Sequence, residues 1–98
     1  MTYKLFLSKT AHQFHKKQKP KTQKIIRENL KKLEQQPHPS PQSKRGDKEK
    51  IILKGIQGYR LHISRTYTAF YQIREKQKEV IIVELMTIDQ AHKKYGKL

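Results

Sequence analysis

The spacing of apolar residues predicts a strand followed by a helix at the start of the chain. Between residues 3 and 7 an apolar residue recurs at every second position, which is the period of a strand. Ser8 stands where a helix would begin, because its side chain can accept a hydrogen bond from a backbone N–H of the first turn. Ala11 and Phe14 would then share one side of this short helix.

A second, longer helix is predicted between two prolines. Pro20 suits the first turn of a helix, because its missing N–H would be unpaired there in any case, and Pro37 ends the pattern. Between them, Ile26, Leu30 and Leu33 recur with helical spacing and leave the remaining surface to lysine and arginine. The two helices together form a basic hairpin with a single apolar seam.

The second half of the chain predicts an antiparallel meander. Residues 37–48 contain three prolines and almost no apolar residue, which indicates a surface loop. Short apolar segments then follow one another at residues 51–53, 59–63, 67–73 and 80–83. The links between the later segments have the length of hairpin turns, and no crossover helix fits between them. We expect the continuous apolar run at 80–83 at the centre of the sheet, and a short helical tail over residues 88–95.

The composition describes a small domain with a thin core. Only 34% of the 98 residues are hydrophobic, so little apolar surface is available for burial. The absence of cysteine excludes disulfides and thiolate metal sites. No apolar stretch approaches the roughly 18 residues of a membrane span, and the first residues run directly into strand-like sequence instead of a secretory signal. We therefore expect one soluble, cytoplasmic domain over residues 1–98 that includes the loop of 37–48.

Charge is the feature that most restricts function. The chain has 23 Lys and Arg against 8 Asp and Glu, a formal net charge of +15. Such an excess favours a polyanionic partner, because each cation placed on a phosphate releases condensed counterions. A membrane surface fits less well, since the basic helices lack the Trp- and Phe-rich face of an interfacial anchor. The residues expected to bind nucleic acid are Lys24, Arg27, Lys31, Lys32, Lys54 and Arg65.

Four short motifs resemble those of one toxin superfamily. They are Leu53-Lys54-Gly55, Gly58-Tyr59-Arg60-Leu61, Tyr67-Thr68-Ala69-Phe70-Tyr71 and a C-terminal basic residue followed by Tyr95. In order and spacing, over nearly the whole chain, this set resembles the RelE/ParE toxins. The resemblance implies an α+β fold in which the N-terminal strand and a two-helix hairpin pack on a twisted antiparallel sheet of about four strands, followed by a short C-terminal helical tail.

The same resemblance implies a function and its partners. Toxins of this superfamily are neutralised by a cognate acidic antitoxin, with which a heterotetramer can form. RelE-like members enter the ribosomal A site and cut mRNA without a metal or other cofactor. ParE-like members share the fold but inhibit DNA gyrase without nuclease chemistry. The first hypothesis for this chain is therefore an mRNA endonuclease whose partners are mRNA and ribosomal RNA.

The resemblance also implies which residues carry the chemistry. Metal-free RNA cleavage requires a base for the 2′-hydroxyl, positive charge for the phosphorane and an acid for the leaving oxygen. Arg60 falls on a basic position of the superfamily and would bind the phosphate. His62 follows on the same face of the strand and would act as base or acid, since histidine titrates near pH ~6.5. His92 or Lys93 would supply the C-terminal basic group, and Tyr95 would stack on a base or relay a proton.

One departure from the superfamily pattern keeps other functions open. Thr68 stands where the superfamily has an arginine, and it cannot stabilise negative charge; Arg65 in the adjacent turn is the nearest replacement. The alternatives are a ParE-like gyrase inhibitor, a RelE fold that only binds its antitoxin, and a nucleic-acid-binding module unrelated to toxins. Asp47 and Glu49 are two positions apart but lack the further motif of a metal nuclease.

Overall fold

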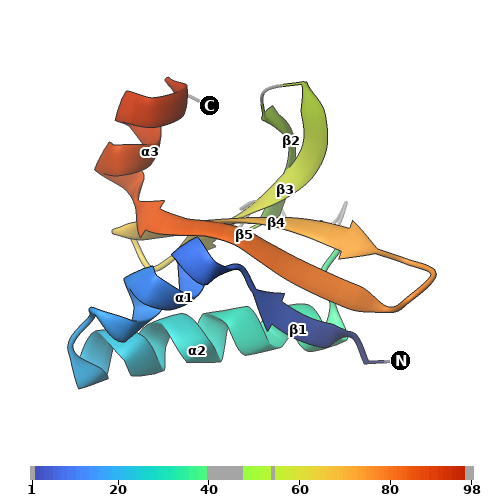
Figure 1. The fold of residues 1–98 in the computed structure, drawn as a ribbon, viewed down its shortest axis with the longest axis horizontal. Coiled ribbons are helices and arrows are strands. Elements are labelled where there is room, and N and C mark those ends of the chain that lie inside the picture. Colours follow the sequence, from blue (N-terminus) through green and yellow to red (C-terminus); the bar gives the residue numbers. More distant parts are fainter. Residues whose placement is uncertain (1, 40–47, 54, 97–98) are drawn as a thin grey trace.

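The computed structural model of the protein describes residues 2–39, 48–53 and 55–96. Within these ranges the elements follow one another in the predicted order (Figure 1). They are β1 (Lys4–Leu7), α1 (Lys9–Lys16), α2 (Pro20–Gln35), β2 (Lys48–Leu53), β3 (Ile56–Ile63), β4 (Tyr67–Arg74), β5 (Glu79–Thr87) and α3 (Ile88–Tyr95). The predicted loop of residues 37–48 connects α2 to β2, and its residues 40–47 lie outside the described ranges.

All five strands belong to one mixed sheet with the order β1-β5-β4-β3-β2. The four strands from β2 to β5 form the predicted antiparallel meander, whereas β1 joins the sheet as a fifth strand that runs parallel to β5. The expectation that residues 80–83 form the central strand is wrong: β4 occupies the centre of the sheet, and β5, which contains residues 80–83, is its neighbour. The apolar run of β5 instead faces both sides of the sheet, with Val80 and Ile82 in the core and Ile81 and Val83 on the opposite face.

The two N-terminal helices cover one face of the sheet, as the resemblance implied (Figure 1). The predicted seam of Ile26, Leu30 and Leu33 is buried against the sheet, and burial of each such side chain stabilises the fold by about 1.5–3 kcal/mol. Ser8 caps α1 by accepting a hydrogen bond from the Ala11 N–H at 3.1 Å. No helix in the described ranges is long and apolar enough to span a bilayer.

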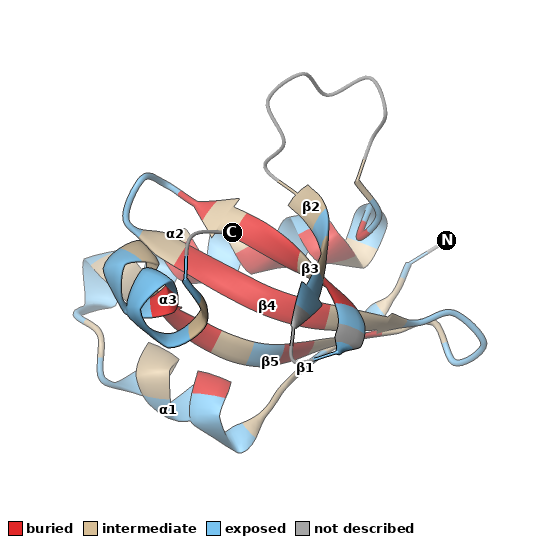
Figure 2. Ribbon diagram, turned by 90° about the horizontal axis from the view of Figure 1, so that it is seen from above, coloured by how far each residue is buried: buried red, intermediate tan, exposed pale blue. Residues whose placement is uncertain are grey.

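The C-terminal helix α3 packs on the opposite face of the sheet. Its start is fixed by Thr87 and Gln90, whose side chains and backbone N–H groups hydrogen-bond reciprocally at 3.0 and 3.1 Å. Ala91 then packs against Phe70 and Met86 in a second, smaller apolar cluster. The strand β4 therefore contributes to both cores, and Figure 2 shows a continuous buried stretch along it.

A buried tyrosine holds the chain where it leaves α2. The Tyr71 hydroxyl donates to the Pro37 carbonyl at 2.6 Å, and the ring stacks on Tyr59 at 5.5 Å between centroids. Burial, with a smaller contribution from Tyr59, raises the pKa of Tyr71, so the phenol remains a donor at every physiological pH. This bond ties the entry of the 37–48 loop to the central strand.

Tyr71→Phe is expected to lower the free energy of unfolding by about 1–3 kcal/mol, because the buried Pro37 carbonyl loses its donor. Urea denaturation monitored by circular dichroism measures this change. Tyr67→Phe is the matched control: Tyr67 is half-buried, and its hydroxyl forms no hydrogen bond with the described residues, so its effect should stay within about 0.5 kcal/mol. Equal effects of the two substitutions would contradict the anchoring role of Tyr71.

Candidate active site

Strand register places four side chains in one row across the sheet, on the face opposite α1 and α2. Glu49 of β2 pairs with Arg60 of β3, Arg60 pairs with Phe70 of β4, and Phe70 pairs with Glu84 of β5. Side chains that pair in this way lie on the same face, close enough to interact. We name these four residues the Arg60 row. His62 lies two positions after Arg60 and therefore on the same face.

Arg60, His62 and Glu49 form one connected cluster at the β2–β3 end of the row. Arg60 Nη2 lies 3.1 Å from Glu49 Oε2 and 2.9 Å from His62 Nε2, and Glu49 Oε1 lies 3.6 Å from the same histidine nitrogen. Arg60 is only 7% exposed. Among the described residues both of its side-chain hydrogen bonds leave from Nη2, which leaves the donors of its second terminal nitrogen for a further oxygen.

The cluster gives His62 two alternative partners. Guanidinium nitrogens only donate, so Nε2 of a neutral His62 accepts from Arg60. After protonation Nε2 becomes a donor, and the carboxylate of Glu49 is the acceptor within reach. The side chain of His62 is about one-third exposed. The geometry therefore suits a histidine that takes up a proton from a ligand and is then stabilised, in its protonated form, by a neighbouring carboxylate.

The other end of the row is held by the end of α3. Tyr95 donates to Glu84 Oε2 at 2.5 Å, and Lys94 Nζ lies 2.6 Å from Glu84 Oε1. The Tyr95 ring also meets Phe70 edge-on, at 5.3 Å between centroids. Burial first, and then the bond to Glu84, raise the pKa of Tyr95, while the bond to Glu84 raises the pKa of Lys94. Both groups thus carry their protons at neutral pH.

The structure gathers some of the predicted catalytic residues and separates others. Arg60 and His62 are in contact, and Tyr95 reaches the same row through Phe70. His92 and Lys93 lie on exposed positions of α3, and no described contact joins them to Arg60 or His62. Their predicted role as the C-terminal basic group therefore has no geometric support beyond their place on α3.

Thr68 and Arg65 do not restore the arginine that the superfamily pattern has at this point. Thr68 is buried opposite His62, and its hydroxyl donates to the Leu61 carbonyl at 3.3 Å. Arg65 lies in the exposed β3–β4 turn, beside Thr87 at the start of α3. Around Phe70 the positive charge on this face therefore comes from Arg60 and Lys94, each of which contacts a carboxylate of the row.

Several residues of the site were missed in the sequence, because strand register alone brings them together. Glu49 stands out in the sequence only with Asp47, as a weak metal-nuclease pair, and Glu84 interrupts an apolar strand, so the sequence assigned neither residue to this site. Lys94 was not predicted, because the sequence of a short helix such as α3 does not determine which of its residues face the sheet. Among the described residues no group of three or more His, Asp or Glu could hold a metal ion, and Asp47 of the weak nuclease motif lies outside them.

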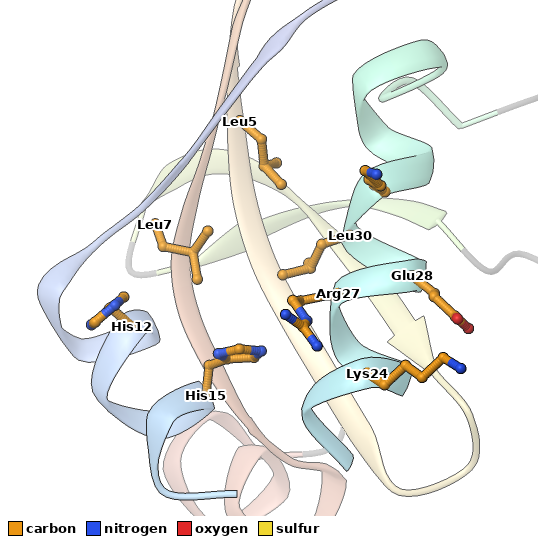
Figure 3. A pocket seen from close by; sticks show the side chains of 9 residues that line it. Leu5, Leu7, His12, His15, Lys24, Arg27, Glu28 and Leu30 are labelled. Carbon is orange, nitrogen blue, oxygen red and sulfur yellow. The ribbon is translucent and has the colours of Figure 1, made fainter. Parts of the chain in front are cut away.

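The predicted basic helix surface lines a groove of about 540 Å³ on the other face of the molecule. Its floor consists of Leu5, Leu7 and Leu30, as Figure 3 shows. Its rim carries basic side chains of both helices and one acid: His12, His15, Lys24, Arg27, Lys31 and Glu28. The lysines and the arginine form no ion pair within the described residues, and they outnumber Glu28, so this rim presents a net positive charge. Lys32 is exposed elsewhere on α2, and Lys54 lies outside the described residues.

Several solved structures with this fold are toxins or toxin–antitoxin complexes. The archaeal RelE–RelB complex from Pyrococcus horikoshii OT3 is 24% identical, with a TM-score of 0.68 over 89% of this chain and 96% of that one. The RelBE2 complex from Mycobacterium tuberculosis is 17% identical, with a TM-score of 0.71 over 89% and 99%. The E. coli RelBE complex is 20% identical, with a TM-score of 0.58 over 85% and 93%. At these identities the likeness establishes the fold.

Sequence comparison establishes the family. No curated protein matches the chain. The model of the family described as the ParE toxin of the type II toxin–antitoxin system parDE matches residues 5–91, which include β2 to β5, all but the first residue of β1, and both helices of the hairpin. The chain therefore belongs to the family of ParE toxins of type II toxin–antitoxin systems, which confirms the resemblance to the RelE/ParE toxins.

Proposed function

We propose that this toxin cleaves mRNA in the ribosomal A site, without a metal, through Arg60 and His62. The observation that carries the proposal is the Glu49–Arg60–His62 cluster, in which a nearly buried guanidinium contacts a histidine at 2.9 Å. Phosphodiester cleavage requires a fixed positive charge beside a group that can accept and return a proton. A structural role alone would not require a histidine beside the arginine on a partly open sheet face.

The reaction transfers one proton at each end of the broken bond. His62 takes the proton of the attacking 2′-hydroxyl, whose oxygen forms the new bond to phosphorus. Arg60 stabilises the negative charge on the phosphorane oxygens with its free terminal nitrogen. The bond from phosphorus to the 5′-oxygen then breaks, and Tyr95, which holds its proton at neutral pH, donates to the leaving oxygen. Glu49 accepts from the protonated His62 and stabilises it.

The rest of the molecule supplies binding charge and an inhibitor surface. The groove cations Lys24, Arg27 and Lys31, together with Lys32 and Arg65, fit the phosphates of ribosomal RNA. Because the solved neighbours include toxins bound to RelB antitoxins, we infer a cognate acidic antitoxin that neutralises part of the +15 charge. The toxin would act in the cytoplasm, where ribosomes are its target.

Inhibition of DNA gyrase is the second candidate function. It is supported by the match to the ParE family model and by Thr68, whose buried hydroxyl replaces an arginine of the RelE-like pattern. In this case the Arg60 row would bind a protein or DNA surface without chemistry. The difference from the first candidate is whether any phosphodiester bond of RNA is cut.

Expression of the toxin in cells, followed by primer extension on abundant transcripts, separates these candidates. We expect new 5′ ends at defined positions within translated codons, and we expect none when translation initiation is blocked. Supercoiling assays with purified gyrase serve as the second arm. Intact transcripts together with inhibited supercoiling would reject mRNA cleavage and establish the gyrase target.

A further inference from the structure

The open face of the sheet carries an exposed apolar patch beside the Arg60 row. Phe6 of β1 pairs with Ile81 of β5, and Val83 lies two positions further along β5 on the same face. Phe6 is 46% exposed and Val83 is 39% exposed, while Ile81 is half-buried. We name these three residues the Phe6 patch. All five Tyr and the two other Phe are buried or half-buried, so Phe6 is the most accessible of the Phe and Tyr side chains.

The patch is held rigidly where β1 ends. Ser8 donates its N–H to the Ile82 carbonyl at 2.9 Å and its hydroxyl to the Val83 carbonyl at 2.6 Å. The register between Phe70 and Tyr71 shifts beside Val83, so Val83 and Glu84 both lie near the open face. The Phe6 patch and the Arg60 row are therefore parts of one continuous surface.

The charges around the patch select a polyanion with apolar groups. Lys4 and Arg74 both pair with Glu79 in the neighbouring row, and both are exposed. On the other side of the patch, Arg60 contacts Glu49 and Lys94 contacts Glu84. Cations thus border both sides of an aromatic and aliphatic floor. Single-stranded RNA presents this combination of phosphates and unpaired bases, and its bases stack on exposed aromatic rings.

We propose that the Phe6 patch is a stacking platform for a nucleobase of the RNA whose phosphate is bound at Arg60. The inference rests on the proposed function and adds a specificity-determining subsite to it. Three inter-strand spacings separate β3 from β1, a path of about 14 Å across the sheet, which a few nucleotides can span. Gln72 pairs with Ile81 between the two sites, so its side-chain amide lies beside the path and can bond a base edge.

The test uses the full-length toxin and a short single-stranded RNA that carries 2′-O-methyl groups, which prevent cleavage. Phe6→Ala is expected to weaken binding by about 10- to 100-fold, the usual effect of removing one stacking aromatic. Phe6→Trp should restore the affinity, whereas Phe6→Leu, which remains apolar but cannot stack, should not. Quenching of a 2-aminopurine base in the RNA reports stacking directly and should follow the same order.

Ile52→Ala is the matched control. Ile52 is 68% exposed, the highest value among the large apolar side chains described, and it lies on the other face of β2 from Glu49. This variant should bind the RNA like the wild type, and thermal unfolding verifies that each variant is folded. Unchanged RNA affinity of Phe6→Ala, or full recovery with Phe6→Leu, would overturn the inference.

The remaining outcomes separate this inference from the proposed function. Loss of antitoxin capture by Phe6→Ala with unchanged RNA binding would assign the patch to the antitoxin, and loss of a concentration-dependent dimer would assign it to a second copy of the chain. If the wild type cleaves mRNA and Phe6→Ala leaves both its rate and its sequence preference unchanged, the stacking platform alone is rejected. If the wild type neither binds nor cleaves RNA, the proposed function itself fails.

Discussion

Simultaneous replacement of Arg60 and His62 by alanine is expected to abolish growth arrest and to slow ribosome-dependent mRNA cleavage by about 10⁴-fold or more. Loss of general acid–base catalysis costs about 10²–10⁴-fold, and loss of a positioned donor to the transition state costs about 10²–10³-fold. Because the two side chains are in contact at 2.9 Å, their effects will not add, and each single variant should lose most of the activity. Single-turnover cleavage on programmed ribosomes measures all three variants.

The control for this experiment preserves the number of substitutions and removes one positive charge. Lys76→Ala with Gln77→Ala changes two exposed residues of the β4–β5 turn and should leave toxicity unchanged. Arg60→Lys keeps a positive charge beside Glu49 and shows whether a loss reflects chemistry or unfolding. A folded Arg60→Ala/His62→Ala protein that remained fully toxic would remove both residues from the mechanism.

Reversal of charge at Lys24, Arg27 and Lys31 to glutamate should weaken binding to ribosomes and RNA by at least about 100-fold at low salt. These cations line one groove and have no acidic partner among the described residues. Each phosphate contact contributes about 0.7 to the slope of log affinity against log salt for single-stranded RNA, so the loss of three contacts should reduce the slope by about 2. Anisotropy titrations from low to high salt give both quantities.

A second triple variant separates local contacts from total charge. Lys9, Lys50 and Lys76 are exposed lysines outside the groove, and their reversal to glutamate changes the net charge by the same amount. If the groove binds phosphates, this control should lose much less affinity than the groove variant and should keep a steeper salt dependence. Equal losses would mean that net charge, and not this surface, attracts the RNA.

Local periodicity predicted the helices well because their cause is local. Ile26, Leu30 and Leu33 occupy one stripe of α2, and Pro20 and the Ser8 cap lie at the helix starts as expected. The place of β1 could not be predicted in the same way. Its partner Glu79–Ile82 lies at the far end of the sequence, and no local pattern states which distant strand will supply its hydrogen bonds or in which direction it will run.

In the candidate site, too, the residues placed by local spacing were predicted and those placed by strand pairing were not. Arg60 and His62 were predicted because they belong to one strand with period two, where spacing fixes the face. Glu49 and Glu84 were not, because they reach the site only through the register of β2 and β5 with their neighbours. At the C-terminus the basic residue in contact with the row is Lys94, one position from the predicted Lys93, and a single residue rotates a side chain by about a third of a helical turn.

The parallel pairing of β1 with β5 links residues as far apart as Ser8 and Val83, 75 positions along the chain. During synthesis the first strand must therefore wait, unpaired, until β5 has left the ribosome, since such distant contacts close late and carry a large loop entropy. The helical hairpin has no completed sheet to cover in that interval. The toxin accordingly completes its sheet only after β5 has been synthesised, so an antitoxin can meet the chain before the fold is closed.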